Sequence, residues 1–122
     1  MRRYQLIDAE TGQVLIARLE LATTFWQRLR GLLFRSALHP GEGLLIRPCR
    51  AIHTHAMRYS IDVVMLDGNG NVLAVHPAVP PWRMLAGPPG TRAVLETASG
   101  FLADRSLLGR HLVVQHDSRC LG

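Results

Sequence analysis

The run Ile61–Leu66 restricts the fold of this chain more than any other part of its sequence. Asp62 is its only polar residue, and three of the others are β-branched, which strands favour. Asp67-Gly68-Asn69-Gly70 follows directly and is rich in residues that accept the positive φ angles of hairpin turns. A second apolar run occupies residues 71–76. This pattern predicts two buried strands joined by a tight turn.

The rest of the chain carries shorter strand signals. Apolar runs bounded by turn formers predict strands at residues 3–7, 14–21, 44–46, 52–56, 93–97 and 111–116. A hairpin loop is expected at residues 8–12, where Gly12 can supply a positive φ. Residues 77–90 hold five of the seven prolines, so we predict an irregular excursion there.

Two short helices are expected. Thr23 or Thr24 can cap the first, which would reach about Phe34, because a threonine hydroxyl accepts hydrogen bonds from free backbone N–H groups. The second is predicted at residues 99–108, with Ser99 as its cap. Strands and helices do not alternate regularly. We therefore predict a mainly β fold, namely a compact, jelly-roll-like antiparallel β sandwich or barrel with one or two short helices packed on it. Residues 1–122 should form a single domain.

Composition excludes several classes of protein. Hydrophobic residues make up 48% of the chain, which argues against disorder. No window reaches the ~18 uninterrupted apolar residues of a membrane span. The N-terminus lacks the apolar core of a secretory signal, so a cytoplasmic location is expected. Cys49 and Cys120 are too few for a disulfide framework, and both are predicted to be free thiols.

The charge pattern bears on the partner. The net charge is +5, and all fourteen basic residues are arginine. Codon bias is one explanation, and an anionic partner is the other, because arginine binds carboxylate and phosphate in a bidentate manner. The arginines are scattered and aromatic residues make up only 6%, which argues against nucleic acid. The expected partner is a small polar or anionic ligand, or a peptide.

Four motifs in order resemble the family known as domain of unknown function 192, or UPF0127. They are residues 28–35, 43–46, 61–67 and 94–96, the last followed by Gly100. Many members have tryptophan where His53 stands, whereas Asp62 and Glu96 fit the family pattern. The resemblance implies a compact β sandwich or jelly-roll-like domain and no established activity.

The polar residues suggest a site. We predict a shallow polar cleft around His53, Arg58, Asp62 and Glu96, in a non-catalytic binding or accessory module without a cofactor. Arg58 would pair with Asp62, because a buried carboxylate needs a compensating partner. Thr54 is a further candidate ligand-binding residue, and so is Trp82 in the proline-rich excursion.

Catalytic alternatives remain open. A small hydrolase could use His53 with Asp62 or Glu96 as its base and orienting group. Cys49 and His53 could form a nucleophile and base. His53, His55 and Cys49 are candidate metal ligands, but this spacing matches no recognised metal module, so no metal is predicted.

Overall fold

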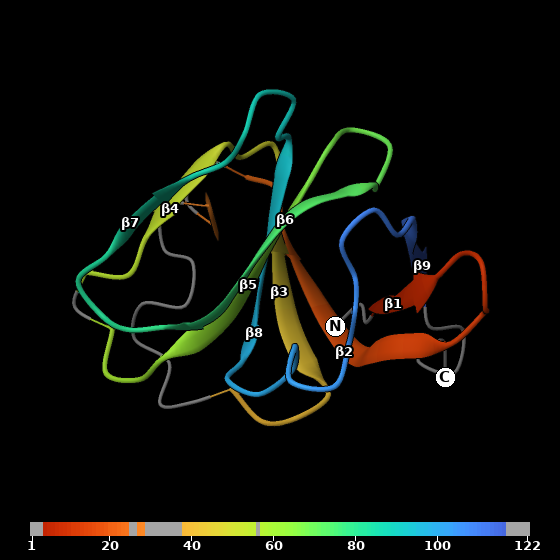
Figure 1. The fold of residues 1–122 in the computed structure, drawn as a ribbon, viewed down its shortest axis with the longest axis horizontal. Helices are drawn as coiled ribbons and strands as arrows, with labels where there is room; N and C mark the ends of the chain where they lie inside the picture. The colour runs from red at the N-terminus through yellow and green to blue at the C-terminus, as the bar shows by residue number, and fades with distance from the viewer. Residues whose placement is uncertain (1–3, 25–26, 29–37, 56, 117–122) are drawn as a thin grey trace.

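Nine strands form almost all of the regular structure in the computed structural model, which describes residues 4–24, 27–28, 38–55 and 57–116 (Figure 1). In chain order they are β1 (Tyr4–Asp8), β2 (Val14–Ala22), β3 (Glu42–Ile46), β4 (Ala51–His53), β5 (Ile61–Leu66), β6 (Val72–Val79), β7 (Met84–Ala86), β8 (Ala93–Ala98) and β9 (Leu112–His116). The predicted mainly β class is confirmed.

Seven of these strands form one sheet in the order β6-β5-β8-β3-β2-β1-β9. Neighbours run antiparallel except β2 and β3, which are parallel, so the sheet is mixed. The sheet curls until its two ends approach each other, and Asn71 and His111 form an isolated bridge between them. The remaining strands, β4 and β7, form a small second sheet that covers one face (Figure 1).

Strand β5 is central because apolar side chains cover both of its faces. Val64 and Leu66 belong to the core inside the curl of the sheet. Ile61, Val63 and Met65 belong to a second core on the outer face, against which Ile52 of β4 and Leu85 of β7 pack. The period-two alternation of a strand thus supplies two separate cores.

Two segments differ from the sequence-based expectations. Strand β7 forms within the stretch predicted to be irregular, where it pairs with β4. The helix predicted at residues 99–108 does not form, and successive tight turns replace it, such as the bond from the Phe101 N–H to the Ala98 carbonyl. Gly100 has a φ of 100°, which a right-handed helix excludes. The carboxylate of Asp62 also accepts hydrogen bonds from the Gly100 and Leu102 N–H groups.

The start of the first predicted helix lies partly within the described residues. The Gln27 N–H donates to Thr24 Oγ1 at 3.2 Å, and the Thr24 N–H donates to Gln27 Oε1 at 3.2 Å. This reciprocal pair is a capping box, as expected for a helix that begins at Thr24. Most of the remaining segment to Phe34 lies outside the described residues.

No helix in the described part of the chain is long and apolar enough to cross a membrane.

Candidate ligand-binding site

Asp62 is buried, and backbone groups satisfy its carboxylate. Oδ1 accepts from the Ala78 N–H at 2.8 Å, and Oδ2 accepts from the N–H groups of Gly100 and Leu102 at 3.2 and 2.8 Å. Arg58 is exposed, and no ion pair joins it to Asp62 among the described residues. The predicted pair is therefore replaced by backbone donors, which stabilise a buried carboxylate without a cation.

Glu96 lies on the opposite face of the sheet from Asp62. In the register of β5 and β8, Asp62 is opposite Thr97 and Val63 is opposite Glu96. Directly opposed residues share a face, so Glu96 points toward the outer core and Asp62 toward the inside of the curl. Burial raises the pKa of Glu96 to about 7. No hydrogen bond or ion pair to its carboxyl group is found within the described ranges.

His53 and Trp82 are exposed on the outer surface of the small sheet, whereas both acids are buried in the large sheet. His53 is exposed on β4, whereas its neighbour Ile52 packs inward. Thr54 is buried, and its hydroxyl donates to the Pro80 carbonyl at 2.7 Å and accepts from the Arg83 N–H at 2.9 Å. Thr54 thus holds the loop that carries Trp82.

Cys49 is half-buried behind the small sheet. Its thiol contacts the Ala51 carbonyl at 3.1 Å. Burial is the main cause that raises the pKa of this thiol, and the charge of Glu96 adds to it, whereas the hydrogen bond to Ala51 and, to a smaller extent, the charge of Arg28 lower the pKa. His53 faces outward, so these two residues do not form a nucleophile and base pair. Cys120 lies outside the described residues.

The structure does not bring His53, Arg58, Asp62 and Glu96 into one cleft. Asp62 lies inside the curl, Glu96 on the outer face of the large sheet, and His53 and Arg58 at the surface. Because of this separation, His53 does not meet Asp62 or Glu96, as the hydrolase alternative would require. Among the described residues, no group of three or more histidine, cysteine or acidic side chains is placed to hold a metal.

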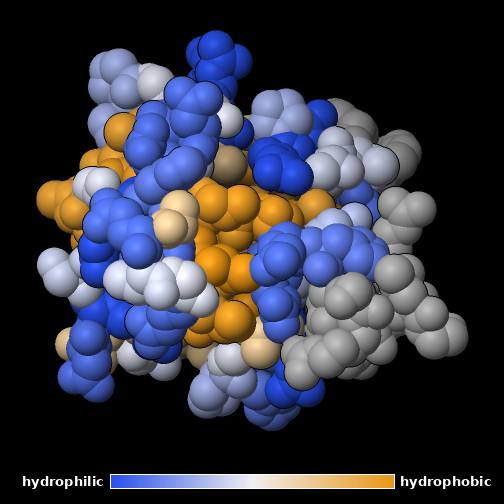
Figure 2. Space-filling model, turned by 90° about the vertical axis from the view of Figure 1, so that its right-hand side faces the viewer, coloured by the Kyte–Doolittle hydropathy of each residue, from blue (hydrophilic) through white to orange (hydrophobic). Residues whose placement is uncertain are grey.

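A cavity of about 820 Å³ lies instead at the open end of the curled sheet. Its floor consists of residues of the inner core, which are Leu6, Leu45, Leu66, Ala93 and Leu112. Figure 2 looks onto this side of the molecule, where apolar residues floor a hollow and hydrophilic residues border it. The volume lies within the range of roughly 300–1,000 Å³ that is usual for small-molecule sites.

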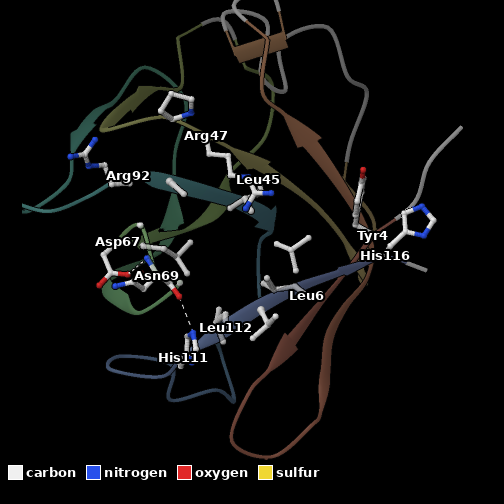
Figure 3. A pocket seen from close by; sticks show the side chains of 17 residues that line it. Tyr4, Leu6, Leu45, Arg47, Asp67, Asn69, Arg92, His111, Leu112 and His116 are labelled. Atoms are coloured by element: carbon white, nitrogen blue, oxygen red, sulfur yellow. Dashed lines mark hydrogen bonds between the residues drawn. The ribbon is translucent and has the colours of Figure 1, made fainter. Parts of the chain in front are cut away.

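The rim of this cavity is cationic. Arg47 and Arg92 line it, and in Figure 3 the side chain of Arg47 points toward the middle of the lining residues while Arg92 lies at the margin. Asp67 also lines it, but the N–H groups of Asn69 and Asn71 donate to its carboxylate, both at 2.9 Å. These bonds, chiefly those from Asn71, lower the pKa of Asp67. The carboxylate stays charged, but no ion pair joins it to Arg47 or Arg92 within the described residues, so both guanidinium groups are available to a ligand.

The opposite part of the rim comes from the ends of the sheet. His111 contacts the Asn69 carbonyl through Nε2 at 2.8 Å, which connects β9 to the turn after β5 (Figure 3). The rings of Tyr4 and His116 meet edge to face, with centroids 5.4 Å apart. Only the turn at residues 67–70 was marked by a pattern in the sequence, because the other rim residues meet through strand pairing and the curl of the sheet.

Comparison with known proteins identifies the family. The sequence profile of a family described as "Uncharacterized ACR" matches residues 6–112. The chain belongs to the DUF192 family. A UPF0127 protein from Thermococcus sibiricus is 31% identical over an alignment of 101 residues that covers 80% of this chain. The chain spans 65% of the length of that relative.

Two solved structures share the DUF192 fold of this chain. A protein of unknown function from Novosphingobium aromaticivorans matches with a TM-score of 0.74 and 22% identity, over 91% of this chain and 83% of the other. A protein from Sinorhizobium meliloti, named as a candidate transcription regulator, matches with a TM-score of 0.73 and 20% identity. That match covers 94% of this chain and 92% of the other. At these identities the likeness concerns the fold alone.

Proposed function

We propose that this chain is a binding or accessory module rather than a catalyst, and that it binds a small anionic molecule with an apolar body. The observation that carries the proposal is the cavity at the open end, which combines an apolar floor with the guanidinium groups of Arg47 and Arg92. The floor would bury the apolar body of the ligand. Arginine would bind its carboxylate or phosphate, because the planar guanidinium matches both groups.

Arg47 is the residue expected to select the anion. Its side chain points toward the middle of the cavity, whereas the stem of Arg92 runs past Gly68 of the turn. Asp67 keeps its negative charge, which backbone and side-chain N–H groups stabilise, and no ion pair joins it to Arg47 or Arg92 among the described residues. A neutral ligand of the same length would therefore lack the interaction that distinguishes the site.

The test compares decanoate with decanol by thermal shift and calorimetry. Decanoate should raise the melting temperature by mass action, and decanol should do so much less. Arg47→Gln should weaken decanoate binding about tenfold or more, because a hydrogen bond to a charged group contributes roughly 1.5–3 kcal/mol. Arg83→Gln removes an exposed arginine that does not line the cavity and is the matched control. Equal binding of decanoate by Arg47→Gln and the wild type, or equal binding of the acid and the alcohol, would refute the proposal.

A further inference from the structure

The small sheet presents four chemically unusual side chains on one surface. His53 is paired with Met84 in the register of β4 and β7. The same antiparallel pairing continues past the strands, because the Thr54 N–H donates to the Arg83 carbonyl at 2.8 Å. His55 then meets Trp82, with ring centroids 5.5 Å apart and planes inclined by 29°. A His-x-His segment thus faces a Trp-x-Met segment.

All four side chains are directed away from the large sheet. Ile52 and Leu85, which precede His53 and follow Met84, pack against the outer core. In paired strands the next residue along points to the other face. Met84 and Trp82 are accordingly 76% and 65% exposed. Nothing in the fold of the described residues requires a thioether at the position of Met84.

The two imidazoles are close together and have free nitrogen atoms. The ring centroids of His53 and His55 are 5.0 Å apart. Neither ring takes part in a hydrogen bond within the described part of the chain, in contrast to His111, whose Nε2 contacts a carbonyl. Two imidazoles and one thioether therefore lie on one surface with their donor atoms unused.

We propose that His53, His55 and Met84 bind a single copper(I) ion, with the ring of Trp82 beside it. Thioether and imidazole donors suit copper(I), whereas divalent metals such as magnesium and calcium prefer oxygen donors. The three ligands are neutral, which fits a monovalent ion better than a divalent one. The face of a tryptophan ring also attracts a cation, so Trp82 would favour the occupied state.

The backbone around this surface is fixed before any metal binds. Thr54 is buried, and its hydroxyl joins the Pro80 carbonyl to the Arg83 N–H. The Trp82 N–H donates to the Thr54 carbonyl at 3.1 Å, and Trp82 itself has a φ of 65°. Non-glycine residues rarely hold this left-handed conformation, and surrounding contacts must impose it. The ligands would consequently need little rearrangement.

The test titrates silver(I), a redox-stable substitute, and copper(I) under reducing, anaerobic conditions with a competing chelator. The background is Cys49→Ser/Cys120→Ser, because thiols bind both ions, and serine at position 49 can keep the hydrogen bond to the Ala51 carbonyl. The expected result is one ion per chain, with nitrogen and sulfur neighbours by X-ray absorption. Met84→Leu and His53→Asn should each weaken binding at least ~10–100-fold, since even outer partners of metal ligands have effects of this size.

His39→Asn removes an exposed histidine elsewhere and should leave the affinity unchanged. Met84→Leu replaces an exposed side chain and should fold like its parent, which a melting curve would verify. The proposal is overturned if Met84→Leu binds as tightly as its parent. It is also overturned if no ion binds, or if zinc(II) binds as tightly as copper(I) and without dependence on Met84. A surface that merely contacts another protein would give one of these results.

Discussion

Asp62 shows how a single carboxylate can organise three segments of a β protein. Its oxygens accept hydrogen bonds from Ala78 near the end of β6 and from Gly100 and Leu102 after β8. The hydroxyl of Thr97 donates to the Asp62 carbonyl at 3.2 Å. Charged acceptors form hydrogen bonds about twice as strong as neutral ones, so the buried charge holds the end of β6 and the segment after β8 to β5.

Asp62→Asn should therefore lower the free energy of unfolding by ~2–4 kcal/mol. The amide NH₂ of asparagine would face backbone N–H groups and leave buried donors without an acceptor. Urea denaturation measures the change. Arg58→Met is the matched control, and as an exposed substitution it should stay within about 0.5 kcal/mol of the wild type. A comparable loss of unfolding free energy in Arg58→Met would instead indicate the ion pair between Arg58 and Asp62 that the sequence suggested.

Glu96 makes stability depend on pH. Its folded-state pKa of about 7 lies above the ordinary value of 4.5. Below about pH 4.5 both states are protonated, and the contribution to stability is fully present. Between about pH 4.5 and 7 the unfolded chain loses the proton and the folded chain keeps it, so stability falls as pH rises. The difference corresponds to about 3 kcal/mol as an order of magnitude.

Glu96→Gln should remove this dependence. The variant should unfold with similar free energy at pH 5 and pH 8, apart from the contributions of other groups, whereas the wild type should be less stable at pH 8. Denaturant unfolding of both proteins at the two pH values gives the comparison. An identical pH slope for both proteins would mean that Glu96 does not titrate between its ordinary value and about 7.

The turn between β5 and β6 connects the two ends of the large sheet. Gly70 has a φ of 91°, and its carbonyl accepts a hydrogen bond from the Leu112 N–H at 2.8 Å. A Cβ atom at Gly70 would overlap the Leu112 carbonyl oxygen. Glycine is required here for two reasons, the left-handed backbone and the close approach of β9.

Gly70→Ala should cost more stability than Gly12→Ala. Gly12 also has a positive φ, 75°, but a Cβ atom there would meet nothing within 4 Å. Gly12→Ala should cost roughly 1–2 kcal/mol from backbone strain alone. Gly70→Ala adds the overlap and should exceed that loss by at least ~1 kcal/mol, with altered ligand binding at the adjacent cavity. Thermal unfolding of both variants checks the order, and equal losses would contradict the role of the close approach.

The molecule as a whole consists of two layers, a large sheet and a small sheet. Hydrophobic packing supports the large sheet more than the small one. The large sheet has apolar cores on both faces, and β5 and β8 lie near its centre. The small sheet has only two strands, β4 and β7, and both of its edges are open within the described residues. Within the part of the chain that the structure describes, Ile52 and Leu85 are the residues of these strands that pack against the outer core.

Hydrogen exchange should separate the two layers. Amides of β5 and β8 should exchange only through global unfolding, and amides of β4 and β7 through local opening with a smaller free energy. Mass spectrometry or NMR under native conditions resolves the two groups. Equal protection in both layers would show that the small sheet unfolds together with the large one. Copper(I) should raise the protection of β4 and β7 selectively if the proposed site is correct.

Local patterns were sufficient for most strands and insufficient for the site. The bounds of β5 agree with prediction because an apolar run ends at a strong turn signal, and both are properties of neighbouring residues. The predicted helix at residues 99–108 failed because the carboxylate of Asp62, distant in sequence, binds N–H groups there. Strand β7 was missed because its pairing with β4 depends on partners across the proline-rich segment.

Which side chains meet on a functional surface depends on the register of strand pairing. The alternation of residues along a single strand does not reveal this register. Asp62 and Glu96 both read as acids on buried strands, and only the pairing of β5 with β8 places them on opposite faces. Arg47 and Arg92 line one cavity because they flank the paired strands β3 and β8, and Met84 meets His53 because β4 and β7 pair. A sequence specifies which residues alternate, whereas long-range hydrogen bonding decides which of those residues meet.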